Sequence, residues 1–205
     1  PLTVDDETRE ALDGFAGIAV DSTMKIGDTI FREAVLFTHS HIDHFGGIDG
    51  VLSPEEIEAQ GVRLVAPLGF VEEAVSENVM AGVAMQRRAG FMYGKDLARS
   101  VRGHVDTGLG KEPPFGSTVS IAEPTDIIGK TGDTLTIDGV EMVFQYAPAS
   151  EAPAEFTFYL PKQKAFCGAE VVSRNLHNVY TLRGAKVRNA LGWRFPFTIS
   201  SLTRS

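Results

Sequence analysis

The sequence predicts a single α/β domain, and three observations support this prediction. Short apolar runs of strand length recur along the chain, and a few segments of helical pattern lie between them. No internal repeat, low-complexity tract or linker divides the 205 residues. The composition, 43% hydrophobic and 22% charged, is that of an ordinary globular protein long enough to bury a substantial core. We therefore expect one domain that covers residues 1–205.

The first half of the chain is expected to hold helices and strands in turn. Ser53 is a favourable cap, Pro54 stands at the first helical position and Gly61 closes the segment, so both ends of one short helix are signalled. Acidic residues in a first turn favour another helix near the N-terminus. The expected helices are residues 5–15, 53–61 and 70 to about 90, and the expected strands are residues 17–21, 34–38 and 62–67.

The second half is expected to be richer in strands, because alternating or continuous apolar runs are separated there by turn residues. A hairpin turn is expected at residues 137–140. Glycine and proline are so frequent in residues 103–117 that we expect a long loop of the kind that often covers a site. The expected strands are residues 117–124, 133–148 (with the hairpin turn inside), 154–161 and 164–170.

Charge and composition exclude several kinds of protein. A formal net charge of −8 argues against non-specific nucleic-acid binding, which needs a basic face to displace counterions. Cys167 is the only cysteine, so neither an internal disulfide nor a Cys-rich zinc finger is expected. The longest apolar runs fall far short of the roughly 18 residues of a membrane span. The acidic N-terminus does not resemble a secretory signal, and one removed ahead of residue 1 would leave no trace, so the compartment stays unknown.

The segment "THSHIDHFGG", residues 38–47, contains three of the five histidines in the chain. In an extended strand, residues two apart face the same side, so His39 and His41 are expected to point together as the preceding strand ends. Asp43 and His44 follow in a turn, where adjacent side chains can reach one neighbouring point.

This cluster has the composition of a metal site. Imidazoles together with a carboxylate suit Zn²⁺ above all, and Mn²⁺ or Fe as alternatives. Gly46 and Gly47 are expected to let the backbone bend tightly past the metal. The alternative is a surface turn with scattered histidines, but so dense a group is rare by chance. We therefore predict at least one bound metal ion.

The motif HxHxDH at the end of a strand resembles the metallo-β-lactamase superfamily, whose αββα sandwich holds one or two metals at its sheet edge. Further blocks in residues 77–94, 150–156 and 169–193 resemble the alkyl sulfatase branch, which hydrolyses alkyl sulfates such as dodecyl sulfate. These blocks occur in the order found in the family, and the later ones are much more specific than HxHxDH. The resemblance thus implies a metal-dependent sulfate-ester hydrolase.

The resemblance also implies a role for individual residues. His39, His41 and Glu151 would hold a first metal, and Asp43 and His44 a second. Glu170 would bridge the two, and catalysis would involve Asp43 and Glu170 through a metal-activated water. The residues by themselves leave Glu151 and Glu155 equally open as the third ligand, or as surface carboxylates, and the family motif favours Glu151.

A second set of residues is expected to grip the sulfate. His177, Asn178 and Arg183 match the family there, and a planar guanidinium makes paired bonds to sulfate oxygens. Tyr93 would add a hydroxyl donor. Structural alternatives remain open, since Arg183 could form an ion pair and His177 could be a satisfied core histidine.

Three methionines, Met80, Met85 and Met92, accompany the expected long helix together with Phe91. We expect them mainly as core residues. The alternative is that their flexible thioethers line a channel for an alkyl tail.

The chain departs from the family in several places. Family members carry a further histidine on the second metal, and the only histidines still unassigned as ligands here are His104 and His177. Residues 194–205 no longer resemble the family, and its first strands, an early helix and its C-terminal regions with a sterol-carrier-like domain are absent. The resemblance therefore implies a sandwich truncated at both ends: a natural short form, a fragment, or a chain completed by an oligomeric partner.

Three functions are compatible with these observations. The first is hydrolysis of a small-molecule sulfate ester with an alkyl tail. The second is hydrolysis of other substrates by the same fold, such as phosphodiesters, carboxylic esters or lactams, because fold does not fix function. The third is metal binding without catalysis. A homo-oligomer is compatible with each, and the family implies a periplasmic or secreted location.

Overall fold

The computed structural model describes most of the chain, with the backbone alone over residues 18–32. The described residues are 18–26, 29–94, 96–106, 118–173, 179–180 and 186–194. The helix expected at residues 5–15 lies outside them.

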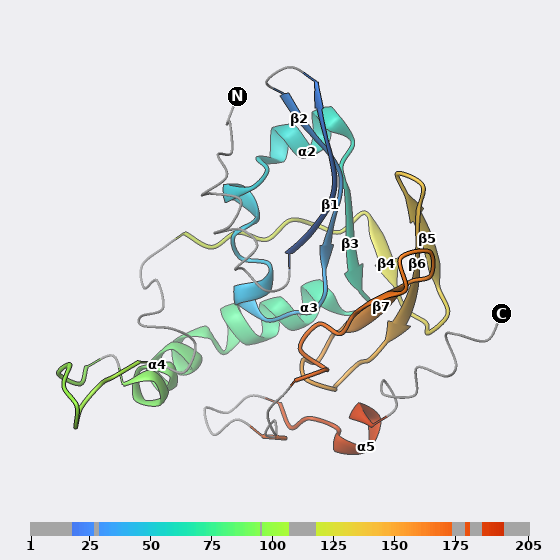
Figure 1. Ribbon diagram of the computed structural model, residues 1–205. Helices are drawn as coiled ribbons and strands as arrows, with labels where there is room; N and C mark the ends of the chain where they lie inside the picture. Colours follow the sequence, from blue (N-terminus) through green and yellow to red (C-terminus); the bar gives the residue numbers. More distant parts are fainter. Residues whose placement is uncertain are drawn as a thin grey trace.

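Two four-stranded sheets form the body of the molecule (Figure 1). In the first sheet, β1 and β2 form an antiparallel hairpin, and β3 and β4 add to it in parallel. The second sheet is antiparallel throughout. The strands are, in sheet order, β1 (Ile18–Ile26), β2 (Thr29–Phe37), β3 (Arg63–Pro67) and β4 (Asp126–Ile128), then β5 (Thr134–Ile137), β6 (Val140–Tyr146), β7 (Phe156–Leu160) and β8 (Ala165–Cys167).

The end of β2 is buried on both faces of the first sheet, and all its residues from Ala34 to Phe37 are apolar. Val35 and Phe37 belong to a cluster on its outer face, whereas Ala34 and Leu36 face the second sheet. The inner cluster also contains Phe144 and Phe156 of the second sheet, and so the two sheets form a sandwich.

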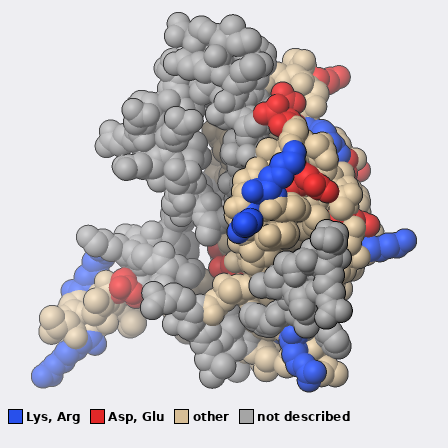
Figure 2. Space-filling view, turned by 45° about the vertical axis from the view of Figure 1, so that its right-hand side comes forward, with Lys and Arg blue, Asp and Glu red and all other residues tan. Residues whose placement is uncertain are grey.

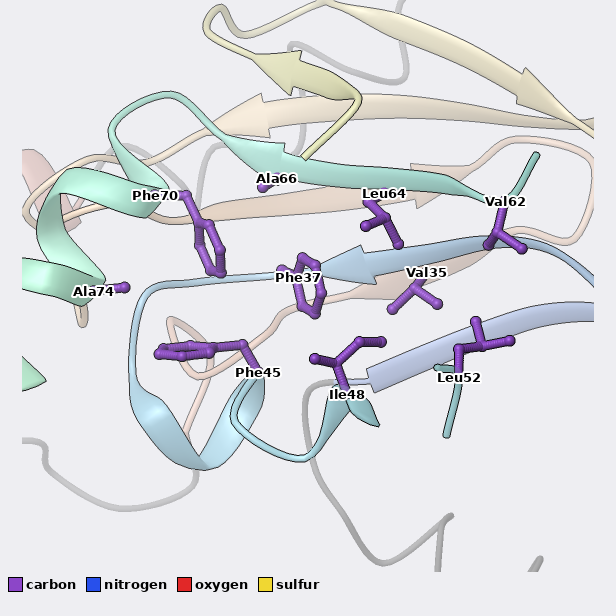
Figure 3. Close-up of a cluster of buried hydrophobic side chains, with 10 residues drawn as sticks. All are labelled: Val35, Phe37, Phe45, Ile48, Leu52, Val62, Leu64, Ala66, Phe70 and Ala74. Atoms are coloured by element: carbon purple, nitrogen blue, oxygen red, sulfur yellow. The ribbon is translucent and has the colours of Figure 1, made fainter. Parts of the chain in front are cut away.

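The outer cluster fixes the turn that carries the histidines (Figure 3). The segment after β2 includes the short helical turns η1 (Ile42–His44) and η2 (Ile48–Gly50). Phe45 and Ile48 are buried beside Phe37, and the rings of Phe37 and Phe70 stack with centroids 5.2 Å apart. Apolar burial on both sides of the histidine motif therefore anchors it to the core.

The helix expected at residues 53–61 is confirmed as α2 (Pro54–Gln60). The side chain of Ser53 accepts a hydrogen bond from the backbone of Glu56, and the carboxylate of Glu56 accepts one from the backbone of Ser53. Gly61 ends the helix in the left-handed conformation, with φ of 62°. Local signals determine this element completely.

The expectation of one long helix from residue 70 to about 90 is wrong. The segment forms α3 (Phe70–Val75), a π-helical turn η3 (Ser76–Met80) and α4 (Gly82–Tyr93). The expectation that its methionines are core residues is wrong as well, since Met80 is 83% exposed, Met92 is 44% exposed and Met85 is only partly buried. Figure 1 shows the reason, because α4 leads away from the two sheets.

The strand expected at residues 117–124 is also wrong. Residues 118–124 run without a strand beside the histidine turn, where the backbone of Ser120 donates a hydrogen bond to Gly46 and its hydroxyl accepts one from Asp49. Strand pairing begins only at Asp126, after Pro124 has removed a backbone donor. The apolar residues of this segment therefore cover a turn rather than extend a sheet.

Each of the other expected strands overlaps an observed strand, although β1 and β2 are longer than expected and β4 was not expected. The hairpin turn between β5 and β6 is formed by Asp138 and Gly139, both with positive φ, as a two-residue hairpin loop requires. Among the described residues, no helix combines the length and apolar character that a membrane crossing needs. Figure 2 shows acidic and basic side chains interspersed over the described part of one face, without a broad basic area.

Candidate metal centre

The histidine motif begins where the two sheets are joined. The backbone of Phe156 donates to Thr38, and that of Ser40 donates to Ala154, at 2.9 and 3.1 Å. His39 therefore pairs with Glu155 in an isolated antiparallel bridge. This arrangement fixes the backbone of the first histidine to the start of β7.

The side chain of His39 is held by its neighbour. Its Nδ1 lies 3.0 Å from the hydroxyl of Thr38, while its Nε2 is buried without a hydrogen-bond partner. The His39 ring centroid lies 5.0 Å from that of His41 and 3.9 Å from that of His44. The predicted convergence of these three rings is thus observed, and one buried nitrogen points toward them unsatisfied.

Glu151 approaches the histidines from the loop between β6 and β7. Its Oε2 lies 2.9 Å from His41 Nδ1 and 3.9 Å from His39 Nε2, and its side chain is almost fully buried. The loop contains Ala149 in the left-handed conformation, with φ of 56°, which is uncommon for a residue other than glycine.

Glu170 approaches from a tight turn after β8. Its Oε2 lies 3.5 Å from Nε2 of both His39 and His44, so that it stands between the two rings. A Cβ at Gly168 would lie 2.8 Å from Val172, so the turn requires glycine there. Ala169, directly before the glutamate, has φ of 46°.

Four of these side chains form a group that could hold a metal ion. The ligand atoms of His39, His41, Glu151 and Glu170 all lie within 4.8 Å of one another. His44 lies beside this group, and Asp43 Oδ2 is 3.6 Å from its Nε2. Asp43 is 66% exposed, so the part of the site that it borders is open to solvent.

The two histidines that face Glu151 differ in how readily they hold a proton. Burial lowers the pKa of His39 to about 4, although the carboxylate of Glu170 opposes this effect. Burial would also lower the pKa of His41, but the carboxylates of Glu151, Glu77 and Asp43 together raise it above its ordinary value. In the metal-free chain His39 is therefore neutral at pH 7, whereas His41 holds a proton more readily than His39 and would release it on binding a metal.

The two glutamates are held as carboxylates. Burial would raise the pKa of Glu151, but His41 in the first place, then His39 and Arg188, lower it to about 2. The imidazoles of His39 and His44, each 3.5 Å from its Oε2, lower the pKa of Glu170 well below its ordinary value. Both are therefore ionised at neutral pH, which is the state that binds cations.

Glu155 lies in the same region but is oriented differently. Its Oε2 accepts hydrogen bonds from the Ser150 hydroxyl and from the backbones of Glu151 and Ala152, at 2.9, 3.1 and 2.9 Å. Burial raises its pKa to about 8. Glu155 therefore organises the loop that carries Glu151, and of these two carboxyl groups only that of Glu151 faces the histidines.

Gly46 and Gly47 differ in what they contribute to the turn. A Cβ at Gly46 would lie 2.7 Å from the Ile42 carbonyl and 2.9 Å from Val119, so a close approach requires glycine there. Gly47 has open space around it and φ of −95°, so the expectation that both glycines are needed is wrong for Gly47.

Sequence reasoning assigned no role to two residues that reach this centre. Glu77, on the π-helical turn η3, places its Oε2 3.9 Å from His41 Nε2. Arg188 forms a buried ion pair with Glu151. Both lie within the blocks that resemble alkyl sulfatases, but the motif itself gives no sign of these contacts. A π-helical turn frequently marks a functional site, which is a structural signal that the sequence does not carry.

The residues expected to grip the sulfate are not brought to this centre by the described part of the structure. His177, Asn178 and Arg183 lie outside the described residues. Tyr93 ends α4, a helix of 12 residues and thus about 18 Å long, at the end remote from η3. The segment 96–106, which contains His104, lies beyond that end (Figure 1).

The fold and the site together define a class: an α/β sandwich with a buried group of histidines and glutamates at one end of its sheets. No family model matches the chain. It is 51% identical over 160 residues to a linear primary-alkylsulfatase from a Pseudomonas species, covering 78% of this chain and 24% of that protein. It is 46% identical over 159 residues to the alkyl/aryl-sulfatase BDS1 of Saccharomyces cerevisiae, with the same coverage.

A solved structure supports the same relationship. The stereoselective inverting sec-alkylsulfatase Pisa1 from Pseudomonas superimposes with a TM-score of 0.77 at 38% identity, over 84% of this chain and 28% of that one. The predicted resemblance and sandwich fold are thus confirmed: the chain is an alkylsulfatase homologue in sequence and fold. It spans about a quarter of the length of the curated relatives it matches.

Proposed function

We propose that the chain carries the metal-binding part of a hydrolase that cleaves alkyl sulfate esters with water. The observation that carries this proposal is the buried group of His39, His41, Glu151 and Glu170 in a homologue of alkylsulfatases. The reaction consumes one water and yields an alcohol and hydrogen sulfate.

The donor set fits zinc. Nitrogen and carboxylate oxygen are the donors that Zn²⁺ takes in catalytic sites, where three protein ligands leave a position for water. His39, His41 and Glu151 would supply these three, and the buried, unpartnered Nε2 of His39 supports this assignment. Asp43, His44 and Glu170 would serve a second ion, with Glu170 shared because it lies 3.5 Å from both His39 and His44. Mn²⁺ or iron would suit the same donors less specifically.

In the proposed reaction, the bound metal, Asp43 and Glu170 would each have a different role. Bound zinc would supply positive charge that lowers the pKa of a water and offsets charge on the sulfate oxygens. Asp43, exposed beside His44, would orient the entering water and accept its proton. Glu170 would remain a carboxylate throughout, because its pKa is held low.

The substrate class rests on the residues expected to grip sulfate. Arg183, with His177 and Asn178, would bind the anionic group through charge-assisted hydrogen bonds, and Tyr93 is a weaker candidate. A neutral ester presents no anionic group with which such a guanidinium could pair in the bound substrate.

The test is a comparison of two substrates. We expect Arg183→Ala to raise KM for dodecyl sulfate, and to lower kcat if the guanidinium also binds the transition state, while a neutral carboxylic ester is barely affected. The rates of sulfate and carboxylate release by wild type and variant provide the measurement. Equal losses on both esters would instead indicate that Arg183 maintains the fold.

A further inference from the structure

The segment 186–194 closes over the two loops that carry Glu151 and Glu170. The backbone of Asn189 donates to the Ala149 carbonyl, in the loop of Glu151. The indole of Trp193, in the short helix α5 (Ala190–Trp193), donates to the Val171 carbonyl at 3.0 Å, next to Glu170. Ala147, Val171 and Trp193 form a small buried cluster between these elements. We call residues 186–194 the strap.

Arg188 is the residue of the strap that enters the site. It is only 8% exposed, and its guanidinium donates from Nε to the backbone carbonyl of Glu151 and from Nη2 to Oε1 of the same residue. The planar fork of arginine is suited to this paired contact, whereas the single ammonium of lysine is not. The backbone and the side chain of Glu151 are thus fixed by one group.

The contact with Arg188 fixes the orientation of the Glu151 carboxylate. Because Oε1 is engaged by Arg188, Oε2 is the oxygen that faces the histidines, 2.9 Å from His41 Nδ1. Without the guanidinium, the carboxylate could rotate about its terminal torsion, which has only a broad preference. Partners of this kind around metal ligands commonly determine metal affinity.

We infer that Arg188 is a positioning residue that turns Glu151 to offer a single oxygen to the metal, and that the strap delivers it. This inference rests on the metal site of the proposed function but not on the identity of the ester. Arg188 itself contacts neither the metal nor the substrate in this role.

The test uses Co²⁺ as a spectroscopic probe of the metal-stripped chain. We expect Arg188→Met to weaken Co²⁺ binding by about 10- to 100-fold and to change the visible absorption of the bound ion, because the ligand geometry changes. Arg188→Lys keeps the charge but not the fork, so it should fold and still show both effects. The control is Lys186→Met, on the same strap, which removes an exposed ion pair with Glu73 and should leave binding and spectrum unchanged.

A double variant separates positioning from general stability. In the Glu151→Gln background, Arg188→Met should weaken Co²⁺ binding much less than in wild type, since the effect passes through the carboxylate. An Arg188→Lys variant that folds and binds Co²⁺ with the affinity and spectrum of wild type would overturn the inference. If the wild-type chain bound no Co²⁺, the metal site of the proposed function would fail instead.

Discussion

The carboxyl groups of Glu151 and Glu155 lie four residues apart in the sequence but differ in charge and in role. Glu151 is ionised and faces the histidines, whereas Glu155 is buried among backbone donors and has a pKa of about 8. The distinction arises from the direction of each side chain. The carboxyl group of Glu155, directly before β7, accepts hydrogen bonds from the backbones of Glu151 and Ala152, whereas the carboxylate of Glu151 faces His41. The negative charge near the histidines is therefore carried by Glu151 rather than by Glu155.

The first prediction concerns the proton on Glu155. Its pKa is about 8 in the folded chain against an ordinary 4.5, so the folded chain binds an extra proton between these values. The free energy of unfolding should therefore fall as the pH rises through this window. Glu155→Gln keeps the acceptor and cannot ionise, so the variant should match wild type near pH 5 and exceed its stability near pH 8.

Urea unfolding of the metal-stripped chains at both pH values measures this difference. Glu155→Ala is the contrasting variant, since it leaves three donors without an acceptor and should be roughly 3 kcal/mol less stable than Glu155→Gln at either pH. If the stability difference between Glu155→Gln and wild type did not change with pH, Glu155 would not carry the extra proton.

At the scale of elements, the histidine turn depends on apolar residues at both its ends. Phe37 precedes the motif and Phe45 and Ile48 follow it, and all three are buried in the same cluster (Figure 3). The polar ligands are thus carried by a short segment with fixed ends. Gly46 allows the approach of Val119 to this segment.

The second prediction tests that close approach with two adjacent glycines. Gly46→Ala should lower the free energy of unfolding by about 1 to 3 kcal/mol, because its Cβ would overlap the Ile42 carbonyl and Val119. Gly47→Ala is the matched control and should stay within about 0.5 kcal/mol of wild type, since nothing lies near its Cβ. Thermal and urea unfolding provide both values, and equal effects would contradict the steric explanation.

The elements predicted correctly from the sequence are those whose ends are determined by cap or turn residues within the element itself. Helix α2 has its cap at Ser53 and its stop at Gly61, and the turn of the second sheet has Asp138 and Gly139. The helix after residue 70 was predicted poorly because apolar spacing alone does not reveal what a helix packs against. Val79 and Val83 are exposed, so among the described residues no core covers that face.

The same distinction applies to the site. His39 to His44 form a continuous motif, so their convergence could be predicted, and the family motif indicated Glu151 over Glu155. Arg188 and Glu77 reach the centre from distant parts of the chain by contacts that arise only on folding. A single sequence carries no physical signal for such contacts.

At the scale of the whole molecule, the two metal positions that we propose differ in their ligands. The first has two histidines and a buried glutamate, whereas the second has Asp43, exposed, with His44 and the shared Glu170. The described residues include no further histidine near it, since the segment that contains His104 lies beyond α4 (Figure 1). A position with one exposed ligand and one shared ligand should hold its ion less tightly.

The third prediction follows for the 205-residue chain. Fewer than two metal ions per chain should remain after dialysis, and occupancy should rise when excess Zn²⁺ or Mn²⁺ is supplied. His104→Ala should change little if water completes the second position, and should remove the second ion if a neighbouring copy lends its histidine. Two fully retained ions, ligated entirely by one chain, would contradict this prediction.

The most direct test of the metal site is the metal content of the purified chain, measured by elemental analysis beside that of a variant with both His39 and His41 replaced by alanine. Removing both imidazoles leaves Glu151 and Glu170 without the nitrogen donors that zinc prefers. We expect one tightly held zinc-like ion per wild-type chain and none in the double variant, with both chains folded by circular dichroism. Full metal content in the double variant would show that the metal is held elsewhere.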